Sequence, residues 1–198
     1  MRILETISEH VMVAAFLRAE IDSPRWGPNI LDRLNQDGRS RAVLDNPNLL
    51  DYTENIYRAS LLAAVRGCTN CGIFYRFPDV VQWYAISMTR GDLEVALVMN
   101  SAPWPEFSGG TRVAGDASRN FKMGKINHPV LSDIKATSDR LKEGYVLPEL
   151  ILVGEAFESP LVILEGHVRT MAILASDVSK EVKTIVGLSP DMRRWFFY

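Results

Sequence analysis

The sequence predicts an α+β fold, with a helical region over residues 1–78 and a mixed α+β domain over residues 79–198. Apolar residues at helical spacing and recognisable helix caps dominate the first region. In the second region, short runs of β-branched and aliphatic residues alternate with helical patterns. The chain has 198 residues, 47% of them hydrophobic and 23% charged, which is the composition of a globular protein that buries a core.

We expect residues 1 to about 70 to be helical. Thr6 and Glu9 have the spacing of a capping box, in which each residue satisfies a free amide of the other. The apolar run that follows predicts a helix packed on several sides, which should end near Ser23. A short second helix is expected over residues 28–35.

Residues 36–48 are rich in turn formers and are expected to form a loop. A further helix should begin after Asp51, because an aspartate followed three residues later by Glu54 is a typical N-terminal cap. Gly67 is well suited to end this helix, since glycine readily adopts the conformation that follows a last helical turn.

The only two cysteines, Cys68 and Cys71, have the Cys-x-x-Cys spacing of a redox pair or of half a zinc site. A structural zinc ion needs four ligands, and none of the three histidines stands at partner spacing. A thioredoxin-like pair would open a helix after a strand, whereas this pair follows a helix. The favoured interpretation is therefore two reduced thiols in a loop.

The second region should begin with a strand over residues 80–88, which is rich in Val, Trp, Tyr and Ile. Two interpretations of the next residues stay open. Thr89 and Asp92 have the spacing of a helix cap, but residues 90–92 would also suit a hairpin turn into a strand over residues 93–99.

A glycine-rich turn at residues 108–112 offers backbone amides that could hold an anion, with Gly110 at its centre and Arg112 at its end. A flexible surface turn explains the same residues and is the favoured interpretation. A basic helix face that would suit a nucleotide, or simply face solvent, follows at Arg119, Lys122 and Lys125.

The remaining pattern predicts a helix over residues 129–142 and short strands over residues 149–153 and 160–164. A last strand is expected over residues 182–188. Residues 190–198 contain four aromatic side chains, which we expect to dock on the core or at a homodimer contact, because large exposed aromatic patches are uncommon on monomers.

Charge and hydropathy narrow the class of partner. The net charge of −2 and the pI near 5.9 weigh against a general nucleic-acid binder, whose affinity depends on clustered Lys and Arg. No apolar run approaches the roughly 18 to 20 residues that span a bilayer, and the first residues do not have a signal-peptide pattern. We therefore expect a cytoplasmic protein without a membrane partner.

The most informative segment is an apolar run over residues 161–175, interrupted by one polar turn. Its pattern predicts a buried strand, a tight turn and a helix with one buried face. Gly166 would let the backbone approach a ligand, where the unpaired amides of the first helical turn favour an anion. Glu165, His167 and Arg169 add a carboxylate, a titratable ring and a guanidinium at the same point.

The motif Glu165-Gly166-His167-Val168-Arg169 resembles the Asp/Glu-Gly-His-x-Arg signature of the ParB/sulfiredoxin-like superfamily, and it is closest to that of the free serine kinases. The resemblance covers residues from about 80 to 190. It implies a small mixed sheet with packed helices, and a loop that holds nucleotide phosphates. Members bind ATP (sulfiredoxin), CTP (ParB proteins) and ADP or ATP (serine kinases).

The chain also departs from each relative. Sulfiredoxin requires a catalytic cysteine directly after the glycine, where this chain has His167. ParB proteins carry a helix-turn-helix domain after the nucleotide fold, and about thirty residues after Arg169 are too few for one. The serine kinases use a glutamate near the start of the domain as base, and the sequence does not place an equivalent.

Two function classes follow from the motif. In the first, the chain is a phosphotransferase or nucleotide hydrolase that acts on a small-molecule substrate with ATP or another nucleotide and Mg²⁺. In the second, it is a non-enzymatic regulatory module, in which a nucleotide or partner sets the docking of the helical region. A nuclease is disfavoured, because the sequence has an acidic balance and no multi-carboxylate metal cluster.

The enzyme hypothesis gives the site residues definite roles. Glu165 is the expected base or metal ligand, and His167 is expected to orient the substrate. The residues expected to bind the nucleotide are Gly166, His167, Arg169 and Thr170 of the motif, with Gly110 and Arg112 of the glycine-rich turn. No residue set is assigned to a resident metal.

Overall fold

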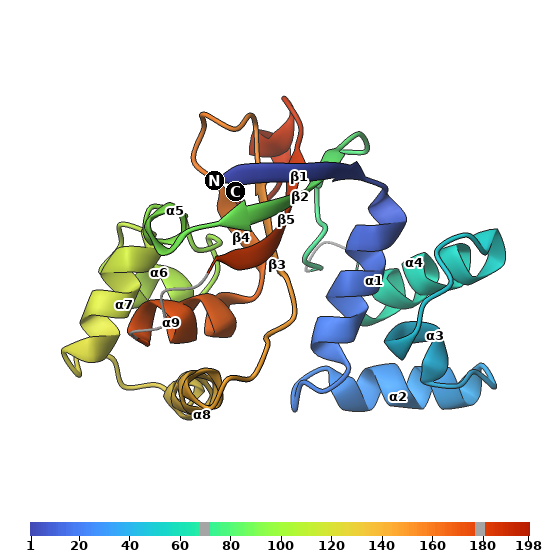
Figure 1. Ribbon diagram of the computed structural model, residues 1–198, viewed down its shortest axis with the longest axis horizontal. Helices are drawn as coiled ribbons and strands as arrows, with labels where there is room; N and C mark the ends of the chain where they lie inside the picture. The colour runs from blue at the N-terminus through green and yellow to red at the C-terminus, as the bar shows by residue number, and fades with distance from the viewer. Residues whose placement is uncertain (68–71, 177–180) are drawn as a thin grey trace.

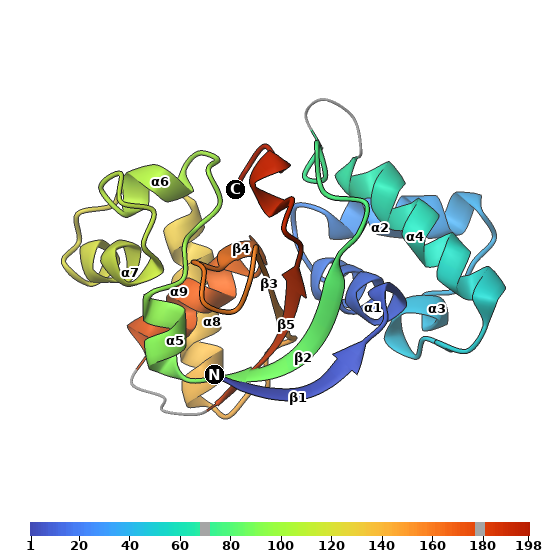
Figure 2. The same cartoon turned by 90° about the horizontal axis from the view of Figure 1, so that it is seen from above.

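The computed structural model describes residues 1–67, 72–176 and 181–198, in which a five-stranded mixed sheet has helices on both faces (Figures 1 and 2). The strand order is β1-β2-β5-β3-β4. The strands are β1 (Arg2–Ile7), β2 (Gln82–Met88), β3 (Leu150–Gly154), β4 (Val162–Glu165) and β5 (Val182–Leu188).

The helices fall into two groups along the chain. Those of the first group are α1 (Glu9–Glu20), α2 (Gly27–Gln36), α3 (Ala42–Asp45) and α4 (Tyr52–Arg66). Those of the second are α5 (Arg90–Glu94), α6 (Trp104–Phe107), α7 (Ala114–Lys122), α8 (Val130–Lys142) and α9 (His167–Ala175), with a short 3₁₀ turn, η1 (Met192–Arg194). The two groups lie on opposite sides of the sheet (Figure 2).

Alternation along the central strands explains how one sheet supports both groups, because successive side chains of a strand point to opposite faces. On β3, Ile151 and Val153 join the core that α1 and α4 form, whereas Leu150 and Leu152 join the core under α5 and α9. All four side chains are fully buried. β3 runs parallel to β5, and the other pairings are antiparallel.

The expectation of helix from the first residue is wrong at the N-terminus. Residues 2–7 form β1, which pairs with β2 from Arg2 opposite Ser87 to Ile7 opposite Trp83. Thr6 therefore lies in a strand and cannot cap α1, which begins after Ser8 without a side-chain capping bond. A six-residue strand is stabilised by pairing with the strand beside it, and local sequence patterns do not predict that long-range pairing.

Most other predicted elements are confirmed. Asp51 accepts the amide of Glu54 at 3.0 Å at the start of α4, and α4 ends before Gly67. The open choice after β2 is resolved as a helix, because Thr89 and Asp92 form a complete capping box at α5. The segment expected to be a loop before α4 also contains the short helix α3.

The C-terminal aromatic segment docks on the core of its own chain. Trp195 is 2% exposed, and its Nε1 donates to the backbone oxygen of Ile73 at 2.6 Å. Phe197 packs on the same core, while Phe196 remains exposed. The prediction for Cys68 and Cys71 lies outside the described residues.

Candidate functional site

The predicted strand, turn and helix are present at the motif, where β4 ends at Glu165 and α9 begins at His167. Gly166 between them has a φ of 103°, a left-handed conformation that L side chains rarely adopt. A Cβ at this position would lie 2.6 Å from Leu150 Cδ2. Only glycine therefore fits this turn without a shift of its surroundings.

The amides of the first turn of α9 have no partner within the helix. The amide of Thr170 donates to the Gly166 oxygen at 2.8 Å, so the three preceding amides stand before the first bond of that ladder, at the positive end of the helix. Thr170 is fully buried, and its Oγ1 has no hydrogen-bond partner in the structure. Unpaired buried polar atoms are uncommon, and each calls for an explanation.

Arg169 uses its guanidinium within the protein. Its Nη1 donates to the backbone oxygens of Pro148 (3.0 Å) and Glu149 (2.9 Å), and its Nη2 donates to Glu165 Oε1 at 2.7 Å. The residue is 9% exposed. Arg169 thus fastens the motif turn to the segment that enters β3 through Nη1, and its Nη2 orients the Glu165 carboxylate.

The His167 side chain also makes its contacts within the protein. The ring is buried and stacks on Trp104 with 4.7 Å between centroids, and its Nε2 accepts the amide of Met99 at 3.2 Å. Burial, together with the charges of Arg66 and Arg169, lowers the pKa of His167 to about 3. The imidazole is therefore neutral near pH 7, and its bond to Met99 fixes which nitrogen carries the proton.

Among the described residues, no hydrogen bond or ion pair joins the glycine-rich turn to the motif. Arg112 donates to the backbone oxygen of Val98 at 3.0 Å and to that of Tyr198 at 2.9 Å, so it holds the C-terminal segment. Gly110 has no heavy atom within 4 Å of the position a Cβ would take. Because Met99 bonds His167 and its neighbour Val98 bonds Arg112, the turn supports the motif only through this intervening segment.

Two charged residues that sequence reasoning missed lie at the motif. Glu20 is the last residue of α1 and is 5% exposed. Arg66 is the last residue of α4, and its Nε lies 3.5 Å from Glu20 Oε1, with no hydrogen-bond partner among the described residues. The Arg66 guanidinium also lies 4.0 Å from the Trp26 ring centroid.

The Glu20 carboxyl lies beside the Glu165 carboxyl, and two carboxylates that close repel each other, which favours a proton on one of them. Burial, the largest cause, and the charge of Glu165 raise the pKa of Glu20 to about 8, while Arg66 and Arg169 act in the opposite direction. Near neutral pH, Glu20 therefore keeps a proton beside Glu165 and two guanidinium groups.

These four side chains, Glu20, Arg66, Glu165 and Arg169, define what we call the junction cluster. It joins the ends of α1 and α4 to the turn between β4 and α9, from opposite ends of the chain. Perturbed titration in a group of converging charges is typical of functional sites, because isolated charges are expensive to bury.

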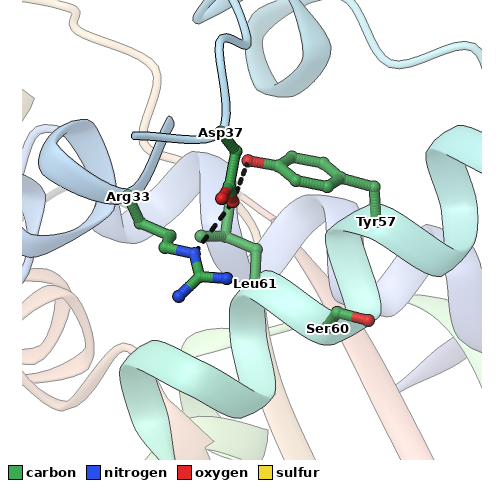
Figure 3. Close-up of a pocket in the computed structure, with 5 residues that line it drawn as sticks. All are labelled: Arg33, Asp37, Tyr57, Ser60 and Leu61. Atoms are coloured by element: carbon green, nitrogen blue, oxygen red, sulfur yellow. Dashed lines mark hydrogen bonds and ion pairs between the residues drawn. The ribbon is translucent and has the colours of Figure 1, made fainter. Parts of the chain in front are cut away.

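A pocket between α2 and α4 is a weaker candidate for a functional site than the junction cluster. It encloses about 250 Å³ and is lined by Arg33, Asp37, Tyr57, Ser60 and Leu61 (Figure 3). Asp37 accepts from Arg33 at 2.8 Å and from the Tyr57 hydroxyl at 3.1 Å, so its charged groups neutralise one another on an exposed surface. The described ranges contain no grouping of three or more His, Cys, Asp or Glu that could hold a metal ion.

Comparison of the chain with protein-family models, curated proteins and solved structures gives no match. Within the described part of the chain, no helix is both long and apolar enough to cross a membrane. Function is therefore inferred from the junction cluster and its chemistry.

Proposed function

We propose that the chain is a cytoplasmic nucleotide-phosphate-binding protein of ParB/sulfiredoxin-like fold, which acts as a small-molecule phosphotransferase or nucleotide hydrolase. The observation that carries the proposal is the convergence of the buried Glu20 and Glu165 carboxyl groups with Arg66 at the positive end of α9. Such a group combines an acid–base pair with cations at the place where the motif suggests a phosphate.

The cations have different roles in this proposal. We assign the contact with phosphate oxygens to Arg66, because its buried Nε has no hydrogen-bond partner among the described residues and its side chain keeps 11% of its surface exposed. The amides of the first turn of α9 and the unpaired Thr170 hydroxyl supply further donors. Arg169 is a positioning residue, because its three bonds hold the turn and the Glu165 carboxylate.

The carboxyl pair would handle the proton. A hydroxyl group that attacks a phosphorus atom must lose its proton, and a carboxylate beside the phosphate site can accept it. Glu165 is the expected proton acceptor, since Arg169 binds it at 2.7 Å and Glu20, with its pKa raised to about 8, keeps its own proton. His167 is neutral and buried, so it keeps the turn in shape through Met99 instead of transferring protons.

Isothermal titration with ATP, ADP and CTP in the presence of Mg²⁺ tests the binding step. We expect a saturable heat for at least one nucleotide, and an affinity at least about tenfold weaker in Arg66→Met, since a charge-assisted bond contributes about 1.5–3 kcal/mol. Arg33→Met, at the exposed pocket of Figure 3, is the matched control and should bind as the wild type does. Negligible heat for the wild type with all three nucleotides would reject the proposal.

A second function, the non-enzymatic nucleotide-responsive module, is favoured by one observation. The cluster connects α1 and α4 with the motif turn, so an anion at Arg66 would compete with Glu20 and alter how the helices dock. Turnover distinguishes the two functions. If bound nucleotide persists unchanged with Mg²⁺ and a panel of hydroxyl acceptors, and equally in wild type and Glu165→Gln, the module is the better account.

A further inference from the structure

One edge of the sheet is covered by another segment of the chain, and the other edge is open. At the β4 edge, Leu97 bridges Val162, with the Leu97 amide bonded to the Leu161 oxygen and the Ile163 amide to the Leu97 oxygen, both at 2.8 Å. At the other edge, β1 pairs with β2 alone, and the structure describes no segment along its outer side (Figure 2). An open strand edge can pair with another strand.

β1 is exposed on its faces as well as along its edge. Arg2, Ile3, Leu4 and Glu5 are all exposed, with Ile3 at 52% and Leu4 at 46%. No helix of the described ranges covers this end of the sheet, since α1 turns away after residue 8 (Figures 1 and 2). Two large apolar side chains therefore lie in solvent on a strand with an open outer edge, which is uncommon unless something covers them.

A register shift in β1 determines which of these four side chains share a face of the sheet. Arg2 is opposite Ser87 and Glu5 is opposite Ala85, two residues apart on β2, so Arg2 and Glu5 lie on the same face of the sheet despite their odd spacing. Leu4 is the extra residue between them. The strand thus presents a cation, two apolar residues and an anion along one edge.

We propose that β1 pairs antiparallel with β1 of a second copy of this chain, about a two-fold axis between Ile3 and Leu4. This arrangement places Arg2 of each copy opposite Glu5 of the other and brings the exposed Ile3 and Leu4 side chains together. Opposite charges across a strand pair attract, and the two-fold axis forms the pair twice. The two five-stranded sheets become one continuous sheet.

The charges also explain why the occupant is an identical strand. Charged residues and a bulge normally protect an edge, because a foreign strand seldom offers matching charges in the right register. An antiparallel copy of the same Arg-Ile-Leu-Glu order matches at both ends. Arg2 already lies 3.3 Å from Glu181 of its own chain, and because both side chains are exposed, Arg2 can turn toward the second copy.

Sedimentation velocity over a range of concentrations tests the proposal. We expect the wild type to reach twice its mass of 22.2 kDa, and Arg2→Glu or Glu5→Arg to raise the dissociation constant at least about tenfold, since each puts like charges together twice. The double variant Arg2→Glu/Glu5→Arg restores both attractions and should recover the dimer. Glu143→Arg makes the same charge change at an exposed position after α8 and should leave the dimer intact.

Hydrogen exchange gives a readout that does not depend on mass. The β1 amides should exchange more slowly as the wild-type concentration rises, and at unchanged rates in the single variants, while circular dichroism confirms that all variants are folded. A wild type that stays monomeric at every concentration, or a double variant as weak as the single variants, would overturn the proposal. Neither result would bear on nucleotide binding at the junction cluster.

Discussion

Replacing Glu20 by glutamine should remove a pH-dependent loss of stability. Glutamine has nearly the same shape, stays neutral at every pH, and its amide can still donate to Glu165. In the wild type, the pKa of Glu20 is raised from 4.5 to about 8 in the folded state, so the folded protein holds a proton that the unfolded chain releases. The wild type should therefore lose stability as the pH rises from 4.5 to 8.

The size of the effect follows from the change in pKa. Each factor of ten in proton affinity corresponds to about 1.4 kcal/mol, so the full change would lower the free energy of unfolding by about 5 kcal/mol across this window. That value is an upper bound, because it assigns the whole change to Glu20 alone. A difference of about 2 kcal/mol or more between pH 5 and pH 8 is the expected result.

Urea unfolding of wild type and Glu20→Gln at several values between pH 5 and pH 8 provides the measurement. The variant should match the wild type at pH 5 and exceed its stability at pH 8, whereas Glu9→Gln, at an exposed position of the same helix, should follow the wild type. If the free energies of unfolding of wild type and Glu20→Gln change in parallel with pH, the raised pKa of Glu20 in the folded protein is refuted.

Three further predictions concern the fold around the site. Gly166→Ala should lower the free energy of unfolding by about 2–4 kcal/mol, because the new Cβ would meet Leu150 and the backbone φ is 103°. Gly110→Ala is the control: its φ is 91° but the space around it is open, so the free energy of unfolding should fall by only about 1 kcal/mol. Thermal melts of both variants and the wild type provide the comparison. His167→Gln should reduce the loss of stability on acidification from pH 6.5 toward 3, since the folded ring resists protonation, as acid titration followed by circular dichroism would show. Trp195→Phe leaves a buried carbonyl unpaired and should cost about 1–3 kcal/mol in chemical unfolding; no measurable loss would contradict the role of that hydrogen bond.

Local signals in the sequence were sufficient wherever a short segment determines its own structure. Asp51 and Thr89 cap helices as their spacing indicates, and the turn at Gly166 follows from its place between an apolar run and an amphipathic one. These features depend on contacts within a few residues, so periodicity and capping chemistry are enough to find them.

Long-range contacts account for what was missed. β1 is a strand because β2, some eighty residues later in the chain, lies beside it. Glu20 and Arg66 each end a helix in the sequence, and only the fold brings them to Glu165. One signal was available for Glu20, since an acid at the end of a helix that is apolar on nearly all sides has little access to water.

Arg169 illustrates a related limit. The sequence predicts a guanidinium at the end of a turn, and the structure places it there, but two backbone oxygens just before β3 occupy the group. Those oxygens lie about twenty residues away, and no residue type marks them in advance. Whether an arginine binds a ligand or its own chain is thus decided by packing that periodicity does not describe.

The position of β5 has a consequence for how the chain acquires its structure. Residues 182–188 are the last of the sheet to be synthesised, yet they stand in its middle and, among the described strands, join the β1–β2 pair to the β3–β4 pair. Until these residues emerge from the ribosome, the β1–β2 and β3–β4 pairs can form, but the continuous sheet that separates the two apolar cores cannot. Assembly of this molecule should accordingly be a late, concerted event, and a chain shortened before residue 182 should expose both interiors to chaperones and proteases.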